Sequence, residues 1–78
     1  MGGYTYTVLL DPSDEGDGYT VTVPALPGCI TQGSTIDEAL ERAKEAIAVH
    51  IEGLRADGEE IPWQKVPPRL EQVTVEMD

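Results

Sequence analysis

The chain contains one cysteine and one histidine, two side chains that often carry nucleophilic chemistry. A reactive cysteine needs a neighbouring base or cation that lowers the pKa of its thiol. Cys29 follows a proline–glycine turn, whereas His50 falls on the apolar side of a predicted helix. The pattern favours Cys29 as a small buried side chain and His50 as a partly buried core residue. We therefore expect no catalytic residue.

Metal and cofactor chemistry is not indicated either. A four-ligand zinc site cannot be assembled within one chain from one cysteine and one histidine. A single cysteine also excludes an internal disulfide. We expect no metal and no cofactor.

Charge is the strongest compositional feature. Fifteen acidic residues against five basic ones give a formal net charge of −10. This balance opposes direct binding to DNA or RNA, which depends on Lys and Arg neutralising phosphates. It favours a basic partner protein, whose approach it would steer, although the acids would also serve to keep a small domain soluble.

The first residues, "MGGYTYTV", lack the basic region and apolar core of a secretion signal. No apolar run approaches the roughly 18 residues that a membrane span needs. We expect a cytoplasmic protein without membrane contact.

Two segments alternate between apolar and polar residues, as strands do. They are Tyr4–Leu10 and Tyr19–Val23, and the turn-rich stretch Asp11–Gly18 separates them. The pattern predicts an antiparallel hairpin with one apolar face and one threonine-rich face.

A rigid corner follows in "VPALPGCITQGST". Pro24 has no N–H for a ladder, so the second strand must end there. Pro27 and Gly28 suit the two corners of a tight turn. The chain then returns as a short strand near Ile30, which Gly33 ends.

A long amphipathic helix comes next. Thr35 and Glu38 have the spacing of a capping box, in which each side chain takes a backbone N–H, and Gly58 suits the helix end. The predicted buried stripe, widened by Ala39 and Ile51, consists of Ile36, Leu40, Ala43, Ile47, His50 and Leu54. A proline-rich connection leads to a last predicted strand, Leu70–Met77.

These elements predict an α+β fold with a three- to four-stranded, mostly antiparallel sheet in the order β-β-β-α-β and one helix on one face. Residues 1–78 would form a single domain. Because so small a domain buries a marginal core, we also expect self-association as a homodimer, or as a tetramer.

The combined pattern of the chain resembles the HicB-like antitoxin family. The stretch "GYTVTVPALPGCITQGSTIDEALERAKEAI" and the helix exit "DGEEIP" carry the resemblance. The matching positions are Gly18, Tyr19, Pro24, Leu26, Pro27, Gly28, Cys29, Thr31, Gly33, Thr35, Glu38, Ala39, Ala43, Glu45, Ala46 and Ile47.

The resemblance implies a partial ribonuclease-H-like fold and an antitoxin function. Proteins of this family bind and neutralise HicA toxins, which are small basic proteins that cleave messenger RNA. Many members continue into a DNA-binding segment. This chain ends at Asp78, directly after its last predicted strand, so we expect no separate DNA-binding domain and no direct contact with nucleic acid.

Two surfaces are candidates for contact with such a toxin. One is the acidic hairpin loop, with Asp11, Asp14, Glu15 and Asp17; the other is the turn formed by Leu26, Pro27, Gly28 and Cys29. Each also has a structural reading, as a solvated turn and as a corner of the fold. The residues expected to build the fold are Pro24, Pro27, Gly28, Gly33, Thr35 and Glu38.

Two other functions stay open. The chain could be an interaction or regulatory domain without a toxin of its own. It could also be a degenerate nuclease of the ribonuclease H type, which would need converging carboxylates on two metal ions. The acids available for that site are Asp11, Glu38, Glu45 and Glu76, and the capping role of Glu38 speaks against it.

Overall fold

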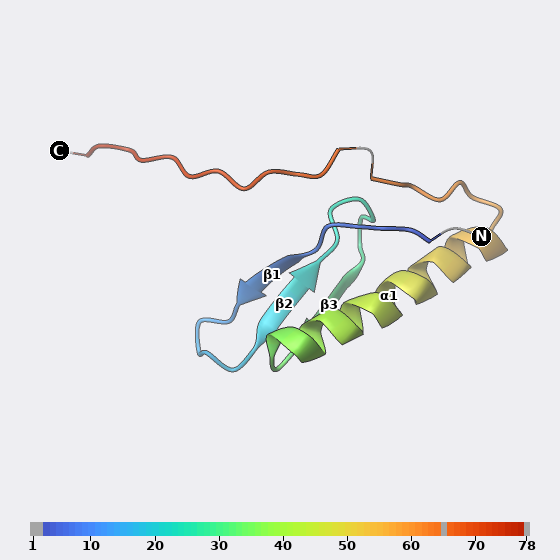
Figure 1. Cartoon of the computed structure of the whole chain (residues 1–78), viewed down its shortest axis with the longest axis horizontal. Coiled ribbons are helices and arrows are strands. Elements are labelled where there is room, and N and C mark those ends of the chain that lie inside the picture. The colour runs from blue at the N-terminus through green and yellow to red at the C-terminus, as the bar shows by residue number, and fades with distance from the viewer. Residues whose placement is uncertain (1–2, 65, 78) are drawn as a thin grey trace.

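The computed structural model describes residues 3–64 and 66–77. Three strands, β1 (Leu9–Pro12), β2 (Tyr19–Thr22) and β3 (Ile30–Gly33), are followed by one helix, α1 (Ile36–Ala56) (Figure 1). The strands form one sheet in the order β1-β2-β3, and both pairs are antiparallel. The α+β class predicted from the sequence is confirmed. The relation to ribonuclease H stays a prediction.

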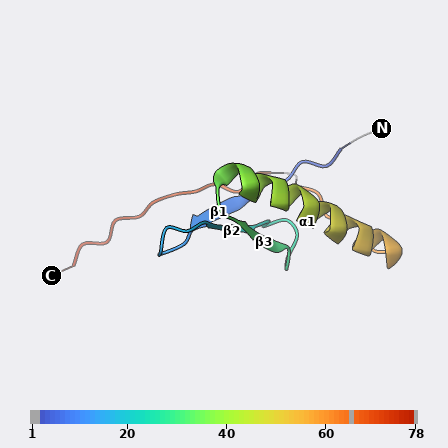
Figure 2. The ribbon, with the colours of Figure 1, turned by 90° about the horizontal axis from the view of Figure 1, so that it is seen from below.

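Helix α1 lies across one face of the sheet (Figure 2). Successive side chains of a strand point to opposite faces of the sheet. Val21 of the central strand points toward the helix, where it is fully buried against Ala39 and Ala43. A second apolar cluster contains Val23, Leu26 and Cys29. The core is therefore two small clusters that share one side of the sheet.

The first strand is shorter and later than predicted. The alternating pattern begins at Tyr4, but pairing begins only at Leu9, opposite Thr22, and continues to Pro12, opposite Tyr19. The ladder cannot extend further toward the N-terminus because its partner strand stops before the proline corner. Asp11 consequently lies in β1 and not in the hairpin turn.

The helix is rotated relative to its predicted buried stripe. Its buried residues are Ala39, Ala43 and Ile51, whereas Ile36 and Leu40 are 52% and 43% exposed. The small side chains of the two alanines let the helix approach the sheet closely. The larger aliphatic residues therefore flank the contact line instead of forming it.

Both helix ends use side-chain or backbone caps. The Thr35 hydroxyl accepts a hydrogen bond from the Glu38 N–H (3.1 Å), as predicted, but the Glu38 carboxylate accepts from the Ser34 N–H (2.6 Å), one residue before the expected donor. At the other end Gly58 has φ 71°. The Gly58 N–H donates to the Arg55 carbonyl and the Glu59 N–H to the Leu54 carbonyl, which is a Schellman motif.

The N-terminal cap should make the stability of the fold depend on pH. The Ser34 N–H holds the pKa of the Glu38 carboxyl below its ordinary value of 4.5. A carboxyl whose pKa is lowered on folding stabilises the fold above its unfolded pKa and loses this effect as the pH falls through its folded pKa. We expect Glu38→Gln to be less stable than the parent protein at pH 7, with the difference disappearing well below pH 4.5.

Urea unfolding at both pH values checks this expectation. Thr35→Ala is the matched control, because it removes the other half of the cap without removing a titratable group and should cost about 1 kcal/mol at either pH. A difference between Glu38→Gln and the parent that does not shrink in acid would contradict the assigned role of the carboxylate.

The predicted last strand is wrong for the single chain. Residues 66–77 are extended but form no ladder, and their large apolar side chains are at least 71% exposed. The alternating pattern favours extended backbone, but a strand also requires the backbone groups of a neighbour. The radius of gyration is 15.2 Å, against about 11–12 Å for a compact domain of this length.

Candidate functional site

The corner between β2 and β3 consists of two successive tight turns. The Leu26 N–H donates to the Val23 carbonyl (3.0 Å), and the Cys29 N–H donates to the Leu26 carbonyl (3.0 Å). Gly28 has φ 85° at the third position of the second turn, directly after Pro27, which is the arrangement of a type II turn. The roles predicted for Pro27 and Gly28 in building this corner agree with the geometry.

The corner separates its residues into a buried and an exposed set. Leu26 is fully buried and Cys29 is 5% exposed, whereas Pro24, Pro27 and Gly28 are exposed. Only the proline–glycine tip is therefore offered to a partner. The Leu26 and Cys29 side chains, which were candidates for contact, instead hold the corner onto the core.

The environment of Cys29 also disfavours nucleophilic chemistry by its thiol. Burial raises the pKa of its thiol, so that the thiol is protonated and unreactive at neutral pH. His50 is half-buried and lines a shallow groove with Cys29 and Arg42. These surroundings are consistent with the predicted roles of Cys29 as a buried side chain and of His50 as a partly buried one.

The acidic loop is exposed and internally braced. The Ser13 N–H donates to the Gly18 carbonyl (2.9 Å), the Asp17 N–H donates to the Ser13 hydroxyl (3.0 Å), and that hydroxyl donates to the Asp17 carboxylate. Asp14 and Glu15 lie at the exposed tip. Three of the four predicted acids, Asp14, Glu15 and Asp17, thus share one loop, and Asp17 stabilises that loop. The fourth, Asp11, lies in β1.

The carboxylates considered for a nuclease do not form a metal site. Glu38 caps the helix, Glu45 is exposed, and Glu76 lies in the extended segment beyond the fold. Across residues 3–64 and 66–77, no three His, Cys, Asp or Glu side chains are grouped so that they could hold a metal ion. In the same described part of the chain, no helix combines the length and apolar character that crossing a bilayer requires.

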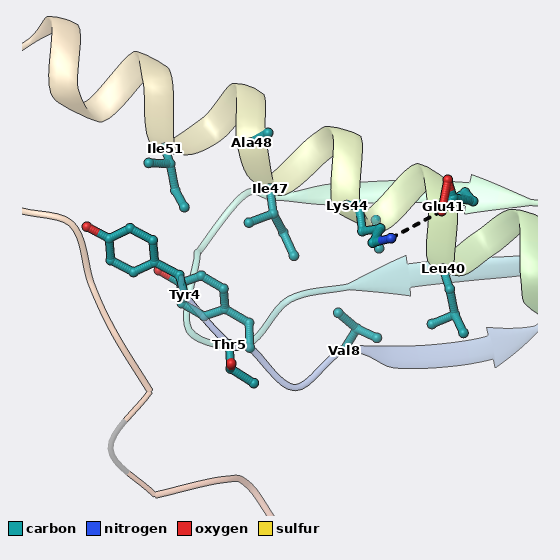
Figure 3. Close-up of a pocket in the computed structure, with 11 residues that line it drawn as sticks. Tyr4, Thr5, Val8, Leu40, Glu41, Lys44, Ile47, Ala48 and Ile51 are labelled. Atoms are coloured by element: carbon teal, nitrogen blue, oxygen red, sulfur yellow. Dashed lines mark hydrogen bonds and ion pairs between the residues drawn. The ribbon is translucent and has the colours of Figure 1, made fainter. Parts of the chain in front are cut away.

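Sequence reasoning missed an apolar groove between α1 and the residues that precede β1 (Figure 3). It has a volume of about 630 Å³, and Leu40 and Ile47 face Val8 and Tyr4 across it. Its signal in the sequence was the alternation of Tyr4, Tyr6 and Val8, which we had assigned to a paired strand. Because residues 4–8 have no ladder, their apolar side chains line an open groove.

The segment after the helix is hydrogen-bonded to Tyr6 and Thr7, which precede β1. The Gln64 side chain accepts a hydrogen bond from the Thr7 N–H (2.8 Å) and donates one to the Thr7 hydroxyl (2.8 Å). The Tyr6 hydroxyl donates to the Pro62 carbonyl. Burial, with a smaller effect of Tyr4, raises the pKa of Tyr6, which keeps this hydroxyl a neutral donor.

Comparison with known proteins identifies a family. Residues 6–78 match the family described as HicB_like antitoxin of bacterial toxin-antitoxin system. A UPF0150 protein of Thermoplasma acidophilum is 53% identical over 57 residues, which are 73% of this chain and 81% of that protein.

Two longer relatives match over part of their length. Antitoxin HicB of Escherichia coli K12 is 42% identical over 57 residues, which are 73% of this chain and 41% of the relative. A 14.9 kDa protein of Haemophilus phage HP1 is 56% identical over 46 residues, which are 59% of this chain and 35% of the relative. The chain thus spans well under half of these two relatives.

Proposed function

The chain belongs to the HicB-like antitoxin family of bacterial toxin-antitoxin systems, and on that premise we propose that it binds and neutralises a small basic toxin of the HicA type. Residues 1–78 would act as one HicB-like domain. The toxin cleaves messenger RNA, so the proposal places both proteins in the cytoplasm.

The observation that carries this proposal is the combination of family membership with an exposed, braced acidic loop. The formal charge of −10 steers a basic protein toward this surface. The hydrogen bonds around Ser13 hold the loop in one conformation, which reduces the ordering that binding must impose. Asp14 and Glu15 at its tip are one proposed contact region, and Pro27 and Gly28 of the corner, at the opposite end of β2, are a second.

In this proposal the chain acts by covering the toxin and performs no chemistry of its own. Support comes from the raised pKa of the Cys29 thiol and from the separate locations of Asp11, Glu38, Glu45 and Glu76. The same charge that favours a basic protein opposes direct contact with RNA or DNA.

The contact surface is tested by reversing charge at the loop tip. Asp14→Lys combined with Glu15→Lys leaves the bracing Asp17 carboxylate in place. We expect this variant to bind the toxin about tenfold more weakly and with a smaller dependence on salt, because an attractive charge at the edge of the interface is replaced by a repulsive one. Calorimetric titration at two salt concentrations measures both effects.

The matched control is Glu59→Lys combined with Glu60→Lys. These neighbouring acids are exposed beyond the helix, and the variant changes the net charge by the same amount. If both double variants weaken binding equally, net charge and not the loop is responsible. Unchanged affinity in the Asp14–Glu15 variant would remove the loop from the interface.

An interaction domain without its own toxin is the second candidate. It would share the fold and the acidic surface, so the two candidates differ only in whether a toxin exists. A basic, toxin-sized protein encoded by the neighbouring gene favours the antitoxin. Purification from the native host without any such partner favours the interaction domain.

A further inference from the structure

Residues 66–77, called the arm below, include the predicted strand Leu70–Met77 but pair with no strand in the described part of the chain. Val73, Val75 and Met77 fall on one side of the extended backbone, and Gln72 and Thr74 on the other. The three apolar side chains are 86%, 71% and 84% exposed. An exposed apolar row on an extended segment is a surface that needs a partner.

The arm is held so that it passes the end of its own sheet. Gln64 is hydrogen-bonded to Thr7, and residues 66–77 run in the same general direction as the chain that enters β1 (Figures 1 and 2). Leu70 lies six residues after Gln64, whereas Pro12, the last residue of β1, lies five residues after Thr7. The extended first part of the arm therefore carries its apolar row, Val73, Val75 and Met77, beyond β1.

The first part of the arm favours this extended course. It contains Pro67 and Pro68, and consecutive prolines adopt the stiff polyproline II conformation. A return of the arm onto β1 of the same chain would require a reversal within this stiff stretch. The arm is instead available to another molecule.

The sheet offers a matching acceptor at its β1 edge. The Ser13 N–H donates to the Gly18 carbonyl, so these two opposite residues are a hydrogen-bonded pair. Hydrogen-bonded and non-hydrogen-bonded pairs alternate along an antiparallel ladder. Leu10, opposite Val21, is therefore in a non-hydrogen-bonded pair, and its N–H and carbonyl point away from β2 toward the open edge. On the helix side, this edge is continuous with the apolar groove beside Val8 and Leu40 (Figure 3). Leu40 is 43% exposed there.

We propose that the arm of one copy adds a fourth strand to the open β1 edge of a second copy, with Val73, Val75 and Met77 entering the groove beside Leu40. The exchange is reciprocal, so the two arms hold together a symmetric homodimer. It supplies backbone partners to the arm and covers the apolar groove in one step. Because each copy carries a charge of −10, the dimer forms more tightly as salt rises.

Nuclear magnetic resonance on a mixture of ¹³C-labelled and unlabelled full-length chains tests the exchange without a mutation. We expect nuclear Overhauser effects between Val73 and Val75 methyl groups of one chain and Val8 and Leu40 methyl groups of the other. The same effects found only within one chain would show that the arm returns to its own sheet. Either that result or their absence would overturn the proposal.

Sedimentation of two charge variants gives an independent measure. Val73→Lys with Val75→Lys should weaken self-association by at least about tenfold, because it places two charges in the apolar groove. Gln72→Lys with Thr74→Lys carries the same charge change on the opposite side of the arm and should remain dimeric. Equal effects of the two variants, or a monomeric parent protein at micromolar concentration, would overturn the exchange.

Discussion

Replacing Leu26 by alanine is expected to lower the free energy of unfolding by about 3 kcal/mol. The Leu26 side chain is fully buried in the apolar cluster of the corner, against which Tyr6, Val8 and Ile47 pack. Its removal leaves a cavity between two turns that are closed by backbone hydrogen bonds and cannot collapse easily. A domain of this size has about 4–12 kcal/mol of stability in all, so the loss is a large fraction of the total.

Urea unfolding followed by circular dichroism measures this effect, and Val49→Ala is the control. Val49 is 68% exposed on the helix, and alanine has the higher helix propensity, so the control should stay within about 0.5 kcal/mol of the parent protein. A Leu26→Ala variant as stable as Val49→Ala would mean that the corner is not anchored by this side chain.

Replacing Gly33 by alanine is expected to cost about 3 kcal/mol, at the upper end of the range for overpacking. A Cβ atom at Gly33 would lie 2.5 Å from the Ala39 backbone nitrogen and 2.6 Å from the Ala39 Cα. Both are backbone atoms of the first helical turns and cannot rotate away. The helix start would have to shift from β3, which would also disturb the cap at Thr35.

The same substitution at Gly53 should have the opposite sign. Gly53 is inside α1, and a Cβ atom there would have no atom within 4 Å. Alanine is favoured over glycine in a helix, so Gly53→Ala should raise the free energy of unfolding by about 0.5–1 kcal/mol. If Gly33→Ala were neutral, the close approach of helix and sheet would be contradicted.

The local turns and caps could be predicted because their chemistry lies within a few residues. Pro27 and Gly28 have few alternative conformations, and the type II turn follows from them. Thr35 and Gly58 likewise mark the two helix ends by their own capping preferences. These features need no knowledge of the rest of the fold.

Other features depend on contacts between distant residues and could not be predicted. The helix pattern contained both alanines and larger aliphatic residues, and only the proximity of Gly33 to Ala39 selects the alanine side. The alternation of Tyr4–Leu10 could not reveal how much of the segment would find a partner. Within the arm, the alternation of Leu70–Met77 predicts a strand for the same reason, although pairing depends on a neighbour.

The candidate site divides in the same way. The exposure of the loop around Asp14 and Glu15 follows from its composition and could be predicted. The burial of Leu26 and Cys29 could not, because the corner residues alternate between core and solvent only once the two turns close.

The most direct test of the proposed antitoxin function is an RNA cleavage assay. A purified toxin of the HicA type is incubated with messenger RNA and increasing amounts of the full chain. We expect cleavage to stop once the chain is present in about stoichiometric amount, and the chain alone to leave the RNA intact. Cleavage that continues at a large excess of the chain would contradict the account.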